Sequence, residues 1–285
     1  ACSSSLVAVH WAMESLRSGA CQFAVAGGVH LNLRLANFAA FQAMGALAGG
    51  GRCRSFDQRA DGFVPSEGVA AVLLRPLADA LAAGDTIHAV LRASATNNDG
   101  RSNGLTAPNP AAQREVLLDA WRAGDVDPRT LTYLEAHGTG TALGDPIEVE
   151  AYRAACQAWD EAHGQSSPRQ TCYVGSVKSN LGHAEAAAGV AGLVKLILCL
   201  EHGELVPTLH FQEPNRHITF EATPLVPLDR RRAWCSNTGQ PRLAGLSAFG
   251  FGGTNVHIVV EEPPTVTANH TNGPPRPELL SLIHI

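Results

Sequence analysis

The chain alternates between short, continuous apolar runs and longer segments in which apolar residues recur every three or four positions. The second pattern is typical of amphipathic helices, and the first of buried strands. Because the two kinds of segment alternate along the chain, they predict an α/β fold with a mixed or parallel sheet. The predicted helices are 4–18, 77–83, 110–122, 147–159 and 184–201, and the predicted strands are 22–26, 69–74, 87–95, 132–136, 173–177, 243–248 and 256–260.

Polar residues and glycines mark where several of these elements begin and end. Ser3 or Ser4 is the expected N-cap of the first helix. Asp145-Pro146 has the N-cap and first-turn residues that start the helix after it. Gly27-Gly28 is expected to close the first strand, which we interpret as short and buried.

The composition is that of a compact globular protein. Of 285 residues, 45% are apolar and 16% are charged, which is enough for a large core and argues against disorder. The net charge of −5 comes without a basic block, so no nucleic-acid partner is expected. The longest apolar run contains Glu185 and Lys195 and is too short and too polar to span a bilayer, so no membrane association is expected. The odd number of cysteines predicts reduced thiols and hence the cytoplasm as the location.

Seven cysteines occur without a Cys-x-x-Cys pair. An odd number in a chain of this size predicts reduced thiols, most of them buried as small apolar side chains. These spacings do not predict a zinc site, and no other metal site is expected.

Cys2 immediately precedes a predicted helix. At that position the helix dipole and the free backbone N–H groups would stabilise a thiolate, and the same N–H groups could form an oxyanion hole. A buried structural cysteine is the alternative, and this residue alone does not decide between them.

Two histidines lie in glycine-rich turns between strands and helices. His137 opens the segment 137–141 (His-Gly-Thr-Gly-Thr), and His183 closes 178–183 (Lys-Ser-Asn-Leu-Gly-His). A helix start favours a neutral imidazole. Each histidine alone is more often structural, but two in such settings, together with a thiol, suit carbon–carbon bond formation through a thioester. The thiol would hold an acyl group while the imidazoles handle the charge on the second reactant.

The segment 250–255 (Gly-Phe-Gly-Gly-Thr-Asn) is a glycine loop between two predicted strands. No helix follows it, so it does not fit a nucleotide-binding loop. It suits a mobile turn that places Phe251 at the mouth of a pocket, and a plain hairpin is the alternative. Asp57, Asp61 and Glu67 are expected to organise a loop, and the ten other histidines, including His30, are assigned to the core or the surface.

These motifs together resemble β-ketoacyl synthases. Ala1–Ser5 and the segments 137–141, 178–183 and 250–255 match that family in order and spacing. The longer string 137–148, and 98–100 with 104–108, resemble the ketosynthase domains of modular type I polyketide synthases. The resemblance covers nearly all of residues 1–262 and implies a thiolase-like αβαβα layered sandwich built from two similar halves.

The resemblance also implies a reaction, a decarboxylative Claisen condensation in polyketide or fatty acid biosynthesis. Cys2 would be the acylated nucleophile, and the N–H groups of Cys2 and Phe251 would form its oxyanion hole. His137 and His183 would promote decarboxylation of a malonyl-type extender and stabilise the enolate, and Lys178 would tune His183.

The implied substrates arrive on the phosphopantetheine arm of an acyl carrier protein, so no directly bound cofactor is expected. Thr139 and Thr141 would bind that arm, Phe251 would gate the pocket, and Gly252 and Asn255 would complete the binding surface. Implied partners are the carrier protein, the other domains of a multidomain synthase and a second copy of the complete domain. Two alternatives remain: a non-catalytic scaffold or chain-length partner, which usually lacks the nucleophile, and a coenzyme A-dependent thiolase, which uses a second cysteine as base.

From the resemblance we expect the first half of the fold to be incomplete. We interpret 1–82 as the remainder of the N-terminal half, 83–262 as the C-terminal half and 263–285 as a linker or tail. An exposed sheet edge predicts that this polypeptide alone is poorly soluble and inactive. Leu280–Ile285 resembles the translation of a sequencing-library adapter, and our hypothesis is that part of the tail is non-native.

Overall fold

A computed structural model describes residues 1–101, 104, 107–164, 169–235 and 239–264. The predicted motif at 104–108 is therefore described only in part. The end segment 280–285, which we interpreted as non-native, lies outside the described residues.

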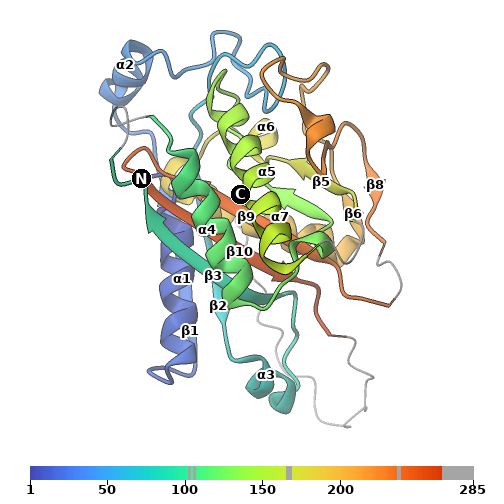
Figure 1. Cartoon of the computed structure of the whole chain (residues 1–285). Coiled ribbons are helices and arrows are strands. Elements are labelled where there is room, and N and C mark those ends of the chain that lie inside the picture. Colours follow the sequence, from blue (N-terminus) through green and yellow to red (C-terminus); the bar gives the residue numbers. More distant parts are fainter. Residues whose placement is uncertain (102–103, 105–106, 165–168, 236–238, 265–285) are drawn as a thin grey trace.

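The described chain contains seven α-helices, ten strands and three short 3₁₀ turns (Figure 1). The helices are α1 (Ser4–Arg17), α2 (Leu35–Ala43), α3 (Leu77–Ala83), α4 (Pro110–Ala123), α5 (Gly144–His163), α6 (Lys178–Leu181) and α7 (Ala188–His202). The strands are β1 (Ala24–His30), β2 (Gly68–Leu74), β3 (Val90–Asn98), β4 (Tyr133–Glu135), β5 (Cys172–Gly175), β6 (Glu204–Leu205), β7 (Leu225–Pro227), β8 (Arg232–Ala233), β9 (Leu243–Phe249) and β10 (Thr254–Glu261). The 3₁₀ turns are η1 (Pro128–Thr130), η2 (Glu185–Ala187) and η3 (Phe220–Ala222).

The main sheet has six strands in the order β3-β10-β9-β4-β5-β7. The strands β3, β10 and β9 pair antiparallel, whereas β9, β4, β5 and β7 pair parallel. The sheet is therefore mixed, as the continuous apolar strands predicted. Its two parallel central strands, β4 and β5, lead into the two histidine segments.

Helices cover both faces of this sheet. The helices α4 and α5 lie in front of it in Figure 1, and α1 and α7 pack on the opposite face. One core cluster, with Trp121 and Tyr152 at its centre, fills the first interface, and a second, around Leu6 and Leu196, fills the other. The antiparallel pair β1–β2 packs against the far side of α1 and α7. The described layers are thus helix, sheet, helix and a two-stranded ribbon.

The first strand differs from its prediction. Gly27 and Gly28 do not close a strand; they lie inside β1, which continues to His30. A Cβ on Gly28 would come within 2.7 Å of the Ser5 Cβ and 2.9 Å of the Ala186 oxygen, so Gly28 permits close packing on α1 and η2. A Cβ on Gly27 would instead come within 2.5 Å of the Ala70 oxygen of β2. The strand is also not fully buried, because alternate residues face outward and Val25 is 74% exposed.

Other predicted boundaries shift by a few residues, and two elements near the site were missed. The helix predicted at 184–201 is divided into η2 and α7. Leu143, not Asp145, is the N-cap of α5. The helix α2 and the short α6 were not predicted, since α2 has no buried face and α6 is a single turn.

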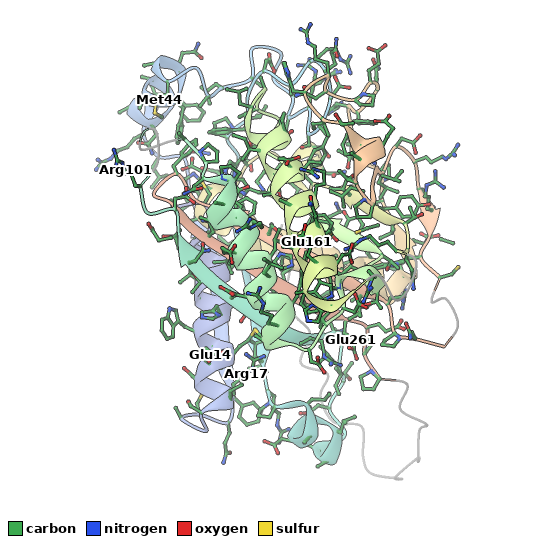
Figure 2. The ribbon with its side chains drawn as sticks, viewed as in Figure 1. Glu14, Arg17, Met44, Arg101, Glu161 and Glu261 are labelled. Carbon is green, nitrogen blue, oxygen red and sulfur yellow. The ribbon has the colours of Figure 1, made fainter. Side chains whose placement is uncertain are left out.

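Charged side chains cover the outer helix surfaces. Figure 2 shows Glu14 and Arg17 on α1, where they form an ion pair of 2.9 Å, and Glu161 on the outside of α5. Within the described ranges, none of the helices combines the length and the apolar character that a membrane crossing requires.

Candidate active site

Cys2 lies two residues before α1 and is buried, with 5% of its surface exposed. The Phe251 backbone N–H donates a hydrogen bond to its sulfur. Burial raises the pKa of the thiol above its ordinary value, and the charge of Lys178 and the Phe251 N–H offset this only in part. The sequence predicted a stabilised thiolate; instead, desolvation outweighs the favourable charges and Cys2 rests as a neutral thiol.

His137 follows β4 in a loop that two acidic residues of α5 hold in place. The Glu148 carboxylate accepts hydrogen bonds from the N–H groups of His137 (2.7 Å) and Gly138 (2.9 Å). Asp145 accepts from the N–H groups of Gly140 (3.1 Å) and Phe56 (2.7 Å). The first turn of α5 therefore fixes the backbone from which the His137 ring projects.

His183 lies between α6 and η2, where a neighbouring segment fixes its backbone. Its N–H donates to the Val64 oxygen at 2.7 Å, and its carbonyl accepts from the Ser66 N–H at 3.1 Å. The Glu185 N–H donates to His183 Nδ1 at 3.1 Å. Because Nδ1 is the acceptor, a neutral His183 carries its proton on Nε2.

The two imidazoles meet edge to face, with ring centroids 5.6 Å apart. Phe249 contacts the His137 ring, and Phe63 contacts the His183 ring. Burial, and then the charge of Lys178, lowers the pKa of both histidines well below the ordinary value. Both rings are consequently neutral near pH 7 and can donate or accept hydrogen bonds without carrying charge.

Lys178 links the three reactive groups. Its Nζ donates to the His137 carbonyl oxygen at 2.6 Å, and its charge lowers the pKa of Cys2, His137 and His183. Its own pKa is lowered by burial, which Glu135 opposes more than any other charge. The resemblance implied that Lys178 tunes His183, and the structure extends this electrostatic influence to all three groups.

The glycine loop joins β9 and β10 as a hairpin. Phe251 stands against Phe41 of α2 and Phe63, with ring centroids 6.4 Å from each. Phe63 in turn contacts the His183 ring, so Phe251 is one aromatic ring away from this histidine, which suits the predicted gate. Gly252 is exposed, and nothing would lie within 4 Å of a Cβ there.

Asn255, which was predicted to bind substrate, is held within the described structure by its own side-chain amide. The residue is buried, and its amide donates to Asp99 Oδ1 at 2.6 Å and Asn97 Oδ1 at 3.1 Å. Because both amide hydrogens are occupied, Asn255 fastens the hairpin to the end of β3 and has none left for a substrate.

Thr139 and Thr141 lie side by side, partly buried, on the loop that follows His137. Their hydroxyl oxygens are 3.3 Å apart, and Thr141 Oγ1 also accepts from the Gly144 N–H at 3.1 Å. The pair is thus adjacent to His137 along the loop, as an arm-binding role requires.

The acidic residues of the segment before β2 organise it as predicted. Asp57 is fully buried and accepts from the N–H groups of Arg59, Gln212 and Glu213. Asp61 pairs with Arg54 at 3.3 Å, and Glu67 accepts from the Asn32 N–H at 2.7 Å.

Comparison with known protein families agrees with this arrangement. The chain matches "Beta-ketoacyl synthase, N-terminal domain" over residues 1–80, "Beta-ketoacyl synthase, C-terminal domain" over 88–212 and "Ketoacyl-synthetase C-terminal extension" over 214–284. The chain belongs to the β-ketoacyl synthase family.

Similar proteins place this ketosynthase chain among polyketide synthases. It is 50% identical over 262 residues to a phenolphthiocerol/phthiocerol polyketide synthase of Mycobacterium tuberculosis, covering 92% of this chain and 14% of that protein. It is 46% identical over 266 residues to the Bacillus subtilis polyketide synthase PksM, covering 92% of this chain and 6% of that protein. The chain therefore spans only a small part of these curated relatives.

Solved ketosynthases share the fold. The ketosynthase from module 6 of the Bacillus subtilis bacillaene synthase superposes with a TM-score of 0.88 at 43% identity, covering 92% of this chain and 46% of that one. The Streptomyces albus oxazolomycin ketosynthase gives a TM-score of 0.86 at 42% identity, covering 92% and 45%. The predicted thiolase-like fold is confirmed.

Sequence reasoning overlooked the carboxylates that support this ketosynthase site. Burial raises the pKa of Glu148 to about 7 and that of Asp145 to about 6, against the hydrogen bonds that lower them. Glu135 accepts from the Val177 N–H at 2.6 Å and pairs with Lys195 at 2.7 Å. Acidic residues at the start of a helix that follows a glycine loop were the available signal, since such carboxylates can accept backbone N–H groups.

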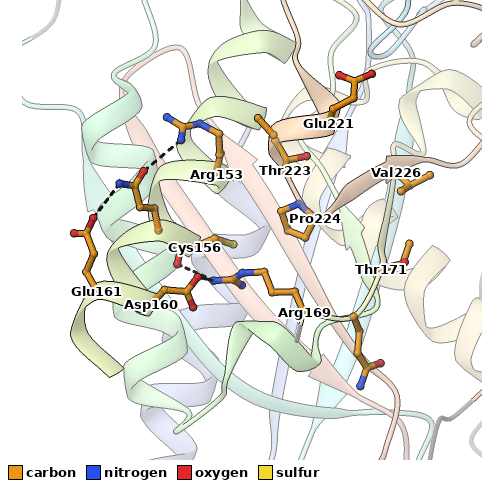
Figure 3. A pocket seen from close by; sticks show the side chains of 13 residues that line it. Arg153, Cys156, Asp160, Glu161, Arg169, Thr171, Glu221, Thr223, Pro224 and Val226 are labelled. Atoms are coloured by element: carbon orange, nitrogen blue, oxygen red, sulfur yellow. Dashed lines mark hydrogen bonds and ion pairs between the residues drawn. The ribbon is translucent and has the colours of Figure 1, made fainter. Parts of the chain in front are cut away.

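A hollow of about 740 Å³ lies elsewhere in this ketosynthase chain, between α5, the segment that leads into β5, and the residues from η3 to β7 (Figure 3). It contains none of the predicted site residues. Arg169 pairs there with Asp160 at 2.8 Å, and Arg153, Gln157 and Glu161 form a hydrogen-bonded chain. In the described part of the chain, no three His, Cys, Asp or Glu side chains gather in a way that could bind a metal ion.

Proposed function

We propose that this chain carries the condensing site of a polyketide ketosynthase, with Cys2 as the acyl-bearing nucleophile. Two observations support this most. The charge of one buried residue, Lys178, lowers the pKa of Cys2, His137 and His183, and the two histidine rings are in contact. A thiol and two neutral imidazoles in one low-dielectric site are the groups that a thioester condensation needs.

In the first step, the Cys2 sulfur attacks the carbonyl carbon of an acyl thioester. The thiol gives up its proton, and the departing pantetheine sulfur takes one. The negative charge that develops on the carbonyl oxygen is held by the N–H groups of Cys2 and Phe251. The raised pKa of Cys2 keeps the thiol protonated until a thioester arrives, so the free enzyme is protected from adventitious alkylation and oxidation.

In the second step, a malonyl-type thioester loses carbon dioxide. The electron pair of the broken carbon–carbon bond moves into an enolate, whose oxygen accepts a hydrogen bond from the Nε2–H of His183, with His137 as its neighbour. The enolate carbon then attacks the acyl carbonyl on Cys2, a new carbon–carbon bond forms, and the Cys2 sulfur leaves. Neutral donors suit this step because they stabilise developing charge without neutralising the extender carboxylate beforehand.

The substrates would reach the site on the phosphopantetheine of an acyl carrier protein, held by Thr139 and Thr141 and admitted past Phe251. The acyl carrier protein, the other domains of a synthase and a second ketosynthase copy are the partners that we propose. No specific observation supports a non-catalytic scaffold or a thiolase: the nucleophile is intact, and the site pairs it with two imidazoles, whereas a thiolase uses a second cysteine as base.

The test uses a ketosynthase domain that contains this chain. Incubation with an acyl-pantetheine thioester should add one acyl mass to the protein, measured on the intact protein, and the Cys2→Ala variant should not gain it. Cys235→Ala, which removes an exposed cysteine far along the chain, is the matched control and should be acylated normally.

A malonyl-carrier protein should then release carbon dioxide and yield a β-ketoacyl product. The His183→Ala variant should become acylated but should not condense. Acylation that persists in the Cys2→Ala variant, or condensation that persists in the His183→Ala variant, would refute the proposed roles.

A further inference from the structure

His30 was assigned on sequence to the core or surface, but it lies at the edge of the candidate site. It is the last residue of β1, and its side chain is 14% exposed. Its Nε2 lies 3.1 Å from Glu185 Oε1, at ion-pair distance, and 3.2 Å from Asn32 Oδ1. Because Asn32 Oδ1 is an acceptor, Nε2 donates its proton there, whereas Glu185 Oε1 lies at ion-pair distance without accepting a hydrogen bond.

Glu185 is the residue whose backbone N–H fixes the His183 tautomer. It adopts φ = +39°, a left-handed conformation that a side-chain-bearing residue takes at a cost in free energy. In this conformation the Glu185 N–H donates to His183 Nδ1 at 3.1 Å. Something must therefore hold the backbone there.

We propose that His30 is a positioning residue that anchors the Glu185 carboxylate and so keeps the Glu185 N–H on His183 Nδ1. The strand that carries His30 is itself fixed against η2, because Gly28 allows contact close enough that a Cβ would lie 2.9 Å from the Ala186 oxygen. The Glu67 carboxylate holds the Asn32 N–H at 2.7 Å, which secures the segment on the other side of His30. The contact between His30 and Glu185 thus joins the β1–β2 ribbon to the histidine that donates from Nε2.

The carboxylate is also close enough to matter electrostatically. The charge of Glu185 raises the pKa of Cys2, and His30 contributes to lowering the pKa of His183. A Glu185 side chain without its partner would be free to move nearer to the thiol, and its negative charge would oppose thiolate formation. Losing His30 would therefore disturb both the tautomer of His183 and the surroundings of Cys2.

The inference rests on the proposed function for its effect on catalysis, but its structural part can be tested without any activity. We would label histidine with ¹⁵N in a ketosynthase domain containing this chain and assign His183 from the signal lost in His183→Gln. The wild type should show a single tautomer with the proton on Nε2 and Nδ1 as acceptor. In His30→Leu the His183 signals should show a mixture of tautomers. In His30→Gln, whose polar amide can still contact Glu185 and donate to Asn32, the single tautomer should return.

The condensation rate should distinguish the same two His30 variants. Condensation should fall about tenfold in His30→Leu, since a catalytic group displaced from its productive geometry loses this much or more. The same loss should be much smaller in His30→Gln. In a Glu185→Gly background, His30→Leu should have no additional effect, because the carboxylate that His30 anchors is gone and glycine adopts a positive φ readily.

The matched control is His88→Leu, which breaks another His–Glu contact, that of His88 with Glu201 on the surface. It should change neither the tautomer nor the condensation rate. If His30→Leu gives the same single His183 tautomer and the same rate as His88→Leu, the proposal is wrong. If no variant, nor the wild type, becomes acylated or condenses, the proposed function fails, while the ¹⁵N spectra still decide whether His30 positions His183.

Discussion

Glu148 offers a quantitative test of how burial acts on the loop that carries His137. Its carboxylate is 5% exposed and accepts the N–H groups of His137 and Gly138. Burial raises its pKa from 4.5 to about 7, although the two hydrogen bonds lower it. At about 1.4 kcal/mol per pKa unit, this difference corresponds to about 3 kcal/mol between the folded and unfolded states.

The direction in which stability changes with pH follows from the direction of the Glu148 pKa shift. Because the folded-state pKa of Glu148 is raised, its contribution to stability is fully present below about pH 4.5 and is lost as the pH rises through about 7. Glu148→Gln cannot ionise and removes this dependence. It also turns an amide N–H toward a backbone N–H, and the unsatisfied buried donor costs about 1–3 kcal/mol at every pH.

The measurement is urea unfolding of a ketosynthase domain containing this chain, followed by tryptophan fluorescence between pH 5 and pH 8. We expect the variant to be less stable than the wild type at pH 5. Between pH 5 and pH 8 the difference should move in favour of the variant by about 2.5 kcal/mol, most of the total given by the pKa change. Glu150→Gln, on the exposed side of the same helix, is the control and should not show this trend. A difference that stays constant from pH 5 to pH 8 would show that Glu148 titrates normally and would refute the reasoning.

Three further outcomes follow from contacts of the described residues. In Lys178→Met, the loss of the nearby positive charge should raise the pKa of Cys2. Iodoacetamide should then alkylate the thiol about tenfold more slowly for each unit by which the pKa rises. An unchanged alkylation rate would contradict the influence of Lys178 on Cys2. In Gly189→Ala, the new Cβ would lie 2.5 Å from Leu6 Cγ, so urea unfolding should show a loss of about 1–3 kcal/mol. Gly49→Ala, which makes only ordinary contacts, should change stability by less than about 0.5 kcal/mol. The chain alone should sediment when its lysate is centrifuged, because the β1–β2 ribbon exposes alternate apolar side chains, and a soluble monomer would contradict this prediction.

Elements with a strong apolar period were predicted well, and those that depend on distant contacts were not. The helices α1, α4, α5 and α7 bury one side against the core, so their sequences carry the 3.6-residue period. The helix α2 has no buried residue and hence no such period. Gly27 and Gly28 resemble a strand end in sequence, but they lie inside β1 because its pairing with β2 continues through them to His30.

The reactive groups themselves could be recognised from local sequence. Cys2 before a helix and two histidines in glycine-rich turns have local signatures, because glycine turns and helix starts are set by nearby residues. Asn255 has the same kind of local signature, yet its amide is taken up by Asn97 and Asp99 from a strand far away in the sequence. A motif therefore identifies a residue but does not predict which partners its side chain contacts in the fold.

By itself, the sequence determined the fold class, the family and the identity of the reactive side chains, because periodicity and motif spacing are properties of neighbouring residues. Only the tertiary structure decided that Cys2 is a neutral thiol, that both imidazoles are neutral, and that His183 carries its proton on Nε2. These properties depend on burial and on partners such as Lys178 and Glu185, which folding brings around the thiol. The native pKa and tautomer are set by the surrounding dielectric and hydrogen-bond partners, and these surroundings form only when the chain folds.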